Sequence, residues 1–350
     1  MSFIRTVLGD IDPVDLGVTY AHEHLVIDGG RPVQLFPDFR LDSVADAVAE
    51  LAPARALGLR AVVDAMPADC GRNAAKLAAI SRAGGIHVVA PTGLHHERYY
   101  DDRHWSVLLD ADEIAALFVA DVEDGIDAHD YGGPVVRRTP HRAGVIKIAG
   151  DADHLTPIEE KVFAAAAAAH VRTGVPILTH CEGGTAGPLQ ARFLVERGVR
   201  PGNVVLSHTD KVVDRAYQRE IFASGATVEY DQGFRWKEGQ ENGTLTLLGW
   251  AFEDGFGDRV VLGMDAARRG YWTVHGGVPG MAWLLGPFAA AMADRGIGAA
   301  EQALLFVGNP ARAFAFARSA SSSPSPSLSP SPSLFPSLSS SPPSSPEPET

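Results

Sequence analysis

The 350-residue sequence predicts an α/β protein that folds as a (β/α)8 TIM barrel, and three observations support this prediction. Eight short apolar runs alternate with segments of helical pattern, which is typical of parallel strands joined by crossover helices. Most of these runs are apolar throughout, as expected for strands that are covered on both sides. The length suits one large barrel. A doubly wound open sheet is the alternative that the same pattern allows.

The chain is expected to begin with a short hairpin over residues 3–17, with a turn at Asp12-Pro13. No repeat of 20–50 residues is evident. The apolar runs that we expect to be strands are 18–24, 60–64, 86–90, 144–149, 175–180, 204–208, 226–230 and 259–265. The helices are expected at about 42–57, 72–83, 111–128, 157–173, 187–197, 212–223, 281–295, 299–306 and 310–317.

Several helices carry start or stop signals. Asp42-Ser43 and Asp112 are the expected N-caps of the first and third helices, because their side chains can accept bonds from free amides. Thr156-Pro157 supplies a cap and a first-turn proline to the long Ala-rich helix. Gly84-Gly85 ends the second helix.

The C-terminal stretch from Ser319 to Thr350 has a different composition from the rest of the chain. It consists almost entirely of Ser and Pro, with a few Leu, Phe and Glu, so it has too little apolar surface to form a core. We therefore expect one barrel domain over residues 1–318 and a disordered low-complexity tail over 319–350.

The net charge of the chain disfavours polyanionic partners. Thirty Lys and Arg against 43 Asp and Glu give a net charge of −13, which argues against nucleic acid or an anionic membrane as a partner. A local basic pocket could still bind a small anionic substrate, which is the partner we expect; a homodimer is a possible assembly. Two cysteines, no signal-like N-terminus and no bilayer-length apolar run predict a reducing, cytoplasmic location.

The stretch Gly17–Ile27 contains His22 and His24 within a predicted strand. Side chains alternate along a strand, so both imidazoles point to one face and could hold one metal ion. Alone, this pattern is also typical of a solvated strand face. Further polar residues interrupt the other apolar runs, and barrel strands converge at their carboxyl ends. The set that we expect to form a metal site is His22, His24, Lys147, His180, His208 and Asp265.

Lys147 is the most unusual member, because a lysine within a barrel strand would be a buried ammonium group. Burial lowers a lysine pKa and favours the free amine, which can add CO2 to form an anionic carbamate. Such a group could bridge two cations. The alternative is an ion pair with Asp265.

The motifs that carry these residues resemble the phosphotriesterase-like family of the amidohydrolase superfamily over about residues 3–317. Arg72 in Cys70-Gly71-Arg72-Asn73 and Asn309-Pro310 also look like this family. The main motifs are His22-Glu23-His24, Val145-Ile146-Lys147, Thr179-His180-Cys181-Glu182-Gly183-Gly184-Thr185, Ser207-His208-Thr209-Asp210 and Leu262-Gly263-Met264-Asp265.

The resemblance implies a binuclear metal centre in a (β/α)8 barrel. By this resemblance His22, His24 and Asp265 would hold the more buried ion, and His180 and His208 the more exposed one. Carboxylated Lys147 (N6-carboxylysine) would bridge the two divalent ions. Zinc is the default metal, although such N/O sites also accept Mn, Co or Fe.

The expected reaction is hydrolysis of an ester or lactone by a metal-bridging hydroxide, with Asp265 as the base. The sequence departs from the organophosphate-degrading branch, which relays the proton through a second acid and a histidine. Lys211 follows Asp210, and no histidine occurs between His208 and His275. A structural and a functional role for Asp210 both remain open.

Three residues beyond the metal set could recognise a phosphate. Lys237 follows the seventh predicted strand, and Arg268 and Tyr271 follow the eighth, so both loops open onto the catalytic face. Their spacing resembles the branch that hydrolyses phosphorylated sugar lactones, although they could also be solvated loop residues. Tyr99 and Tyr100 could line the same mouth or pack, and Cys181 is expected to pack.

Two rival functions remain open. An organophosphate triesterase or acyl-lactone hydrolase would share the metal centre but have no use for a phosphate cradle. A non-catalytic metal-binding barrel would have no need of all six ligand positions.

Overall fold

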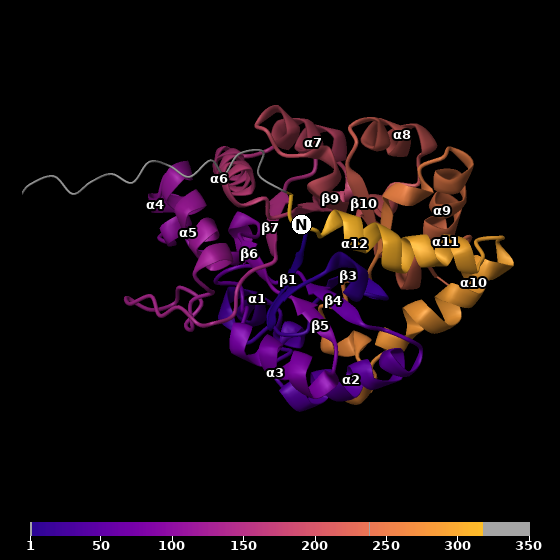
Figure 1. Cartoon of the computed structure of the whole chain (residues 1–350), viewed down its shortest axis with the longest axis horizontal. Helices are drawn as coiled ribbons and strands as arrows, with labels where there is room; N and C mark the ends of the chain where they lie inside the picture. Colours follow the sequence, from indigo (N-terminus) through magenta and orange to yellow (C-terminus); the bar gives the residue numbers. More distant parts are fainter. Residues whose placement is uncertain (1, 238, 318–350) are drawn as a thin grey trace, which may run out of the picture. The chain divides into compact units, whose positions relative to one another are not determined.

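The computed structural model describes residues 2–237 and 239–317. In this part of the chain, a barrel of parallel strands lies at the centre and helices surround it (Figure 1). The predicted tail over 319–350 lies outside the described residues. None of the described helices is both long and apolar enough to cross a membrane.

The strands follow the predicted order. β1 (Ile4–Thr6) and β2 (Gly9–Ile11) form the expected antiparallel hairpin. The barrel strands are β3 (Thr19–Glu23), β4 (Ala61–Asp64), β5 (His87–Val89), β6 (Pro91–Gly93), β7 (Val145–Gly150), β8 (Ile177–Cys181), β9 (Val204–Ser207), β10 (Thr227–Tyr230) and β11 (Val260–Leu262). β5 and β6 together occupy the third barrel position: β5 pairs with β4, and β6 pairs with β7.

The first and last strands complete the barrel. The amides of Met264 and Asp265, just after β11, donate to the carbonyl of His22 in β3 at 3.3 and 3.0 Å. Gly263 makes this approach possible, because a Cβ there would lie 2.8 Å from the His22 backbone. The open-sheet alternative is therefore wrong, since an open sheet would leave these two edges apart.

The helices cover the outside of the barrel. Three helices were not predicted: α1 (Gly30–Leu35), α4 (Trp105–Leu108) and α9 (Gly243–Glu253). The helices are α1 (Gly30–Leu35), α2 (Val44–Ala56), α3 (Ala74–Gly84), α4 (Trp105–Leu108), α5 (Ala111–Glu123), α6 (Pro157–Thr173), α7 (Gly187–Glu196), α8 (Arg215–Ala223), α9 (Gly243–Glu253), α10 (Ala289–Asp294), α11 (Ala299–Ala303) and α12 (Asn309–Ala313).

The capping predictions are confirmed for α2 and α6 and wrong for α5. Ser43 accepts a bond from the amide of Asp46, and Thr156 accepts one from Glu159. In α5 the cap is Asp110, which forms a reciprocal capping box with Glu113, and Asp112 lies inside the first turn. The single helix predicted over 281–295 is divided, because a wider turn over Leu284–Phe288 precedes α10.

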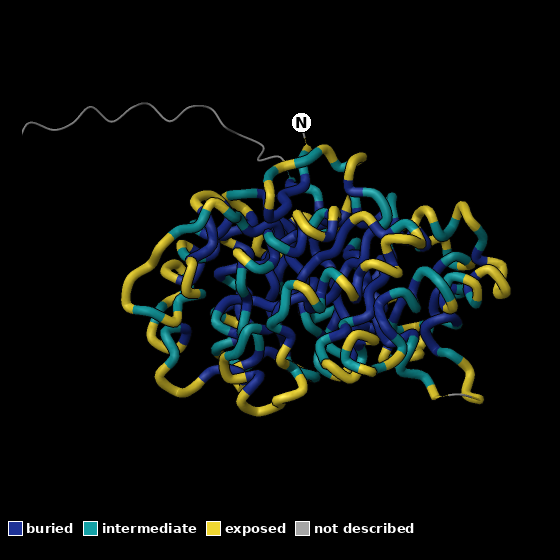
Figure 2. The backbone as a smooth tube through the Cα atoms, turned by 90° about the horizontal axis from the view of Figure 1, so that it is seen from below, coloured by how far each residue is buried: buried dark blue, intermediate teal, exposed yellow. Residues whose placement is uncertain are grey.

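The barrel interior is a packed core at its amino-terminal end. Inward-facing residues of the strands meet the hairpin and α12 there, so the barrel is no open channel. These buried residues include Ala21, Val63, Val89, Val145, Leu178, Val205 and Val261, with Ile4 and Phe314 beneath them. Figure 2 shows buried residues concentrated in the interior of the molecule and exposed residues at its periphery. The polar side chains therefore collect at the opposite, carboxyl end.

Candidate metal centre

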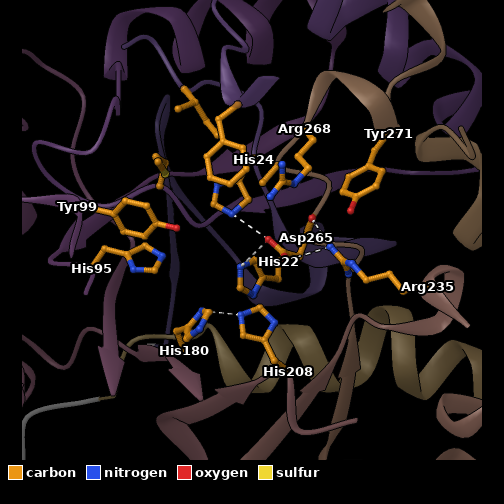
Figure 3. Close-up of a pocket in the computed structure, with 14 residues that line it drawn as sticks. His22, His24, His95, Tyr99, His180, His208, Arg235, Asp265, Arg268 and Tyr271 are labelled. Carbon is orange, nitrogen blue, oxygen red and sulfur yellow. Dashed lines mark hydrogen bonds and ion pairs between the residues drawn. The ribbon is translucent and has the colours of Figure 1, made fainter. Parts of the chain in front are cut away.

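All six predicted metal ligands lie in or just after barrel strands, toward the carboxyl end of the barrel. Figure 3 shows five of them around one pocket: His22, His24, His180, His208 and Asp265. His22 is in β3 and His24 follows it directly; Lys147 is in β7 and His180 is in β8. His208 and Asp265 follow β9 and β11, and both have positive φ angles, 65° and 47°. A positive φ turns each residue out of its strand direction, which is unusual for a residue with a side chain. Strand convergence thus brings together residues that are up to 243 positions apart.

The first group of donor atoms consists of His22, His24 and Asp265. Asp265 Oδ1 lies 3.2 Å from His24 Nε2 and 3.8 Å from His22 Nε2. The other nitrogen of His22, Nδ1, lies 3.2 Å from Glu229 Oε2 and 3.1 Å from the hydroxyl of Ser207. A proton on Nδ1 suits the Glu229 carboxylate, which leaves the lone pair of Nε2 directed at Asp265. A lone pair that faces a carboxylate is repelled by it, and a metal cation between the two atoms would remove this repulsion.

The second group consists of His180 and His208. His208 Nδ1 faces Asp231 Oδ2 at 2.5 Å, and His180 Nε2 faces Glu182 Oε2 at 3.1 Å. These carboxylates each favour the proton on the nitrogen that they contact. The two remaining nitrogens, His208 Nε2 and His180 Nδ1, then turn lone pairs toward each other at 2.9 Å. This arrangement suits a shared metal ion, which both nitrogens could bind.

Lys147 is buried beside these groups. Its side chain is 1% exposed, and its Nζ has no hydrogen-bond partner among the residues that the structure describes. Burial lowers the pKa of Lys147 to about 8, although the charges of Glu229 and Asp265 oppose this shift. The alternative reading of Lys147, an ion pair with Asp265, is therefore not formed as a hydrogen bond among these residues. An unpartnered amine with a lowered pKa fits a group that is carboxylated when metals bind.

The position of Asp265 is fixed from two sides by residues that the sequence interpretation did not single out. The buried carboxylate of Glu23 accepts from the amides of Met264 and Ala266, at 2.8 and 3.2 Å. Arg235 donates to the carbonyl of Asp265 at 2.8 Å and to its Oδ2 at 3.1 Å. Burial alone would raise the pKa of Asp265, but His24 and Arg235 hold it well below its usual range.

Asp210 has a structural set of partners. Its carboxylate accepts from the amides of Asp231 and Gln232 at 3.3 and 2.8 Å, and from the hydroxyl of Thr244 at 2.7 Å. Burial and the charge of Asp231 raise the pKa of Asp210 to about 7. Asp210 thus shapes the turn that presents Asp231 to His208. The sequence signal for Asp231 was only its place directly after a barrel strand.

A cavity of about 250 Å³ opens above the histidines. Arg268 and Tyr271 line it as predicted, and Tyr99 lines the opposite side. Lys237 lies outside this lining, and its side chain is exposed. We expected Lys237 to be the basic residue of this loop that lines the cavity, but Arg235, two residues earlier, lines it instead. Arg268 also forms an ion pair of 2.7 Å with Asp38.

The remaining motif residues have packing or structural contacts. Tyr100 is buried; it donates to the carbonyl of Ala68 at 3.0 Å. Cys181 is also buried, as expected. Arg72 pairs with Asp121 and Asp130, and the Asn309 amide donates to the carbonyls of Gly257 and Val260.

Comparisons with known proteins agree with this geometry. The model of the Phosphotriesterase family matches residues 2–314. The phospho-furanose lactonase of Mycoplasmopsis synoviae is 30% identical over 334 residues, which cover 92% of this chain and 94% of that protein. The phosphotriesterase homology protein of Escherichia coli is 31% identical over 300 residues, 85% of this chain and 98% of that protein.

Solved structures of similar fold agree with these sequence comparisons. An amidohydrolase from Mycoplasma synoviae has a TM-score of 0.85 at 29% identity, with 90% of this chain and 92% of that chain covered. A lactonase from Listeria monocytogenes has a TM-score of 0.82 at 27% identity, with 90% and 100% covered.

Proposed function

The chain belongs to the phosphotriesterase family and is a hydrolase of ester bonds, and we propose that its substrate is a phosphorylated sugar lactone. The observation that carries this proposal is the shared cavity: two arginines and a tyrosine line the same space as the converging histidines. A single small substrate could therefore present its ester carbonyl to the histidines and an anionic group to the basic wall.

The proposal assigns the six residues to two ions. His22, His24 and Asp265 would hold one divalent ion, His180 and His208 the other, and carboxylated Lys147 would join them. Zinc is the first choice, with Mn, Co or Fe as alternatives. When bound, the ions supply an activated water at neutral pH and polarise the carbonyl under attack. Two observations support this assignment: the opposed lone pairs of His180 and His208, and a Lys147 Nζ without a hydrogen-bond partner among the residues described.

The chain itself then handles the proton and the orientation of the reacting groups. Asp265 accepts the proton of the attacking water and returns it to the leaving alkoxide. Arg235 and Glu23 keep the Asp265 carboxylate turned toward His24 while this happens. Asp231 and Glu182 hold His208 and His180 in the tautomers that leave the facing nitrogens free.

The anionic end of the substrate would lie against the basic wall. Arg268 and Arg235 carry permanent positive charges there, and the phenol of Tyr271 adds a neutral donor. Lys237, exposed in the same loop as Arg235, stays part of the predicted cradle and could reach a phosphate that projects from the cavity mouth. Two relatives are named phospho-furanose lactonase, which agrees with such a substrate class.

The test compares substrates on the metal-loaded enzyme. We expect a phosphorylated aldonolactone to have a higher kcat/KM than its unphosphorylated form, a long-chain acyl lactone or an aryl phosphotriester. Arg268→Ala should lower kcat/KM for the phosphorylated lactone by roughly 10- to 150-fold, the worth of a charge-assisted hydrogen bond, and leave the unphosphorylated lactone nearly unchanged. Arg192→Ala, at an exposed arginine of α7, is the control.

Equal turnover of the phosphorylated and unphosphorylated lactones would contradict the proposed cradle. The acyl-lactone or triesterase alternative would then take its place. Equal activity of metal-free and metal-loaded protein would contradict the metal centre itself.

A further inference from the structure

A second cavity lies behind one wall of the catalytic cavity. Its volume is about 330 Å³, and His95 belongs to the lining of both cavities. The second cavity, which we call the side cavity, is lined by His95, by Glu97, Asp101 and Asp102, and by apolar residues that include Ile158 and Val162. Its walls are largely apolar, and three carboxylates belong to its lining. The ring of His95 is thus a partition between a polar site and an apolar space.

Three contacts fix the orientation of His95. Its amide donates to the hydroxyl of Tyr100 at 2.8 Å, and its ring meets the Tyr99 ring edge-on with centroids 4.6 Å apart. Its Nδ1 accepts from the amide of His96 at 2.8 Å. Figure 3 shows the ring next to Tyr99 and His180, on the side of the pocket away from Arg268 and Tyr271.

The bond from His96 also determines the tautomer of His95. A nitrogen that accepts a backbone N–H carries no proton, so the neutral ring holds its proton on Nε2. No hydrogen bond of Nε2 is found within residues 2–237 and 239–317, and Nε2 is not among the sealed polar atoms there without a partner. Since His95 lines the catalytic cavity, Nε2–H is a donor that a substrate oxygen can use.

Building on the proposed function, we propose that His95 determines the substrate class of this site in two ways. Its Nε2–H donates to a carbonyl or hydroxyl oxygen of a small polar lactone. Its ring closes the side cavity, so that an acyl chain has no room beyond the metal ligands. The carboxylates of Glu97, Asp101 and Asp102 further disfavour an anionic group on this side, which directs a phosphate toward Arg268 and Arg235.

Two substitutions separate the two roles. His95→Phe keeps a ring of similar size but has no donor, whereas His95→Ala removes both the donor and the partition. For a phosphorylated aldonolactone, both should lower kcat/KM by about 2- to 12-fold, the worth of a neutral hydrogen bond. For a long-chain acyl lactone, only His95→Ala should raise kcat/KM, by about fourfold for each methylene that enters the side cavity.

A binding measurement provides a readout that does not depend on turnover. In chelator-treated protein, we expect decanoate to bind His95→Ala at least tenfold more tightly than wild type or His95→Phe, because only His95→Ala opens the side cavity to the chain. His129→Ala, at an exposed histidine outside the lining of both cavities, is the matched control and should behave like wild type. Metal content and thermal unfolding of each variant should match those of the wild type.

Each role has its own refuting outcome. Unchanged turnover of the phosphorylated lactone by His95→Phe would refute the proposed donation from His95 Nε2 to the substrate. If His95→Ala gains neither acyl-lactone turnover nor decanoate binding, the His95 ring does not close the side cavity to acyl chains. If the wild-type enzyme does not hydrolyse the phosphorylated lactone, the proposed function is refuted instead. The decanoate-binding measurement would still test whether the His95 ring closes the side cavity.

Discussion

Replacing Lys147 by methionine should stabilise the metal-free protein while destroying its function. Lys147 is buried and its Nζ has no hydrogen-bond partner in the described part of the chain, so its charged form is costly in the folded state. The pKa difference, about 8 in the folded chain against an ordinary 10.5, corresponds to about 3 kcal/mol at neutral pH. Methionine is unbranched and apolar, so it fills a similar space without this penalty.

The pH dependence of this effect has a definite sign. Between pH 8 and 10.5 the unfolded chain keeps the lysine proton and the folded chain has lost it, so the stability of the wild type rises with pH there. The penalty is fully present below about pH 8 and disappears as the pH approaches 10.5. Lys147→Met should therefore be about 3 kcal/mol more stable than wild type at pH 7, and the two should converge near pH 10.5.

Urea unfolding of chelator-treated protein in CO2-free buffer, at several pH values, measures this difference. Lys211→Met, at an exposed lysine, is the control and should change stability by less than about 0.5 kcal/mol at every pH. With metal present, Lys147→Met should lose the stabilisation that the wild type gains from metal binding. If the metal-free variant is less stable than wild type at pH 7, the Lys147 ammonium is compensated in the fold, and the reasoning from burial is refuted.

Three further outcomes are expected. Chelation should remove two ions per chain and abolish activity, as elemental analysis and assay would show; one ion in a fully active enzyme would contradict the centre. Asp265→Asn should keep the fold but lower kcat at least about 100-fold, and an unchanged kcat would place the base elsewhere. Glu50 accepts hydrogen bonds from Thr273, Val274 and Met281, which belong to the segment after Arg268 and Tyr271. Glu50→Gln should therefore lower the free energy of unfolding by about 1–3 kcal/mol and raise KM for the phosphorylated lactone. An unchanged KM would show that this segment keeps its position without the Glu50 carboxylate.

The sequence predicted the barrel and the meeting of the six candidate ligand positions for one physical reason. Parallel strands in a closed barrel end at one face, so a polar residue at the end of an apolar run is expected to lie at that face. His180 and His208 could be brought together in this way without any knowledge of the loops between them. The third strand was predicted less well, because the run Ile86-His87-Val88-Val89-Ala90 did not reveal the break between β5 and β6.

The partners of the ligands could not be predicted, because they depend on side-chain direction across strands. Glu229 was read only as part of an apolar run, yet it contacts His22, which is 207 positions away. Arg235 and Lys237 are both basic and lie two residues apart, and sequence alone gave no reason to prefer the residue that lines the cavity. The choice of Asp110 over Asp112 as cap depended on the backbone angles at the start of α5.

The contact between Arg235 and Asp265 bears on how the proton travels. Arginine remains protonated in proteins and offers no acceptor, so Asp265 Oδ2 cannot pass a proton to Arg235. We therefore expect no relay from Oδ2 through a histidine in this site. We expect the proton to stay on Asp265 until the leaving group takes it. This arrangement suits a lactone, because its leaving alkoxide remains attached to the same molecule and stays near the carboxylate. A triester releases its leaving group to solvent, so it would gain more from a relay that carries the proton away from the site.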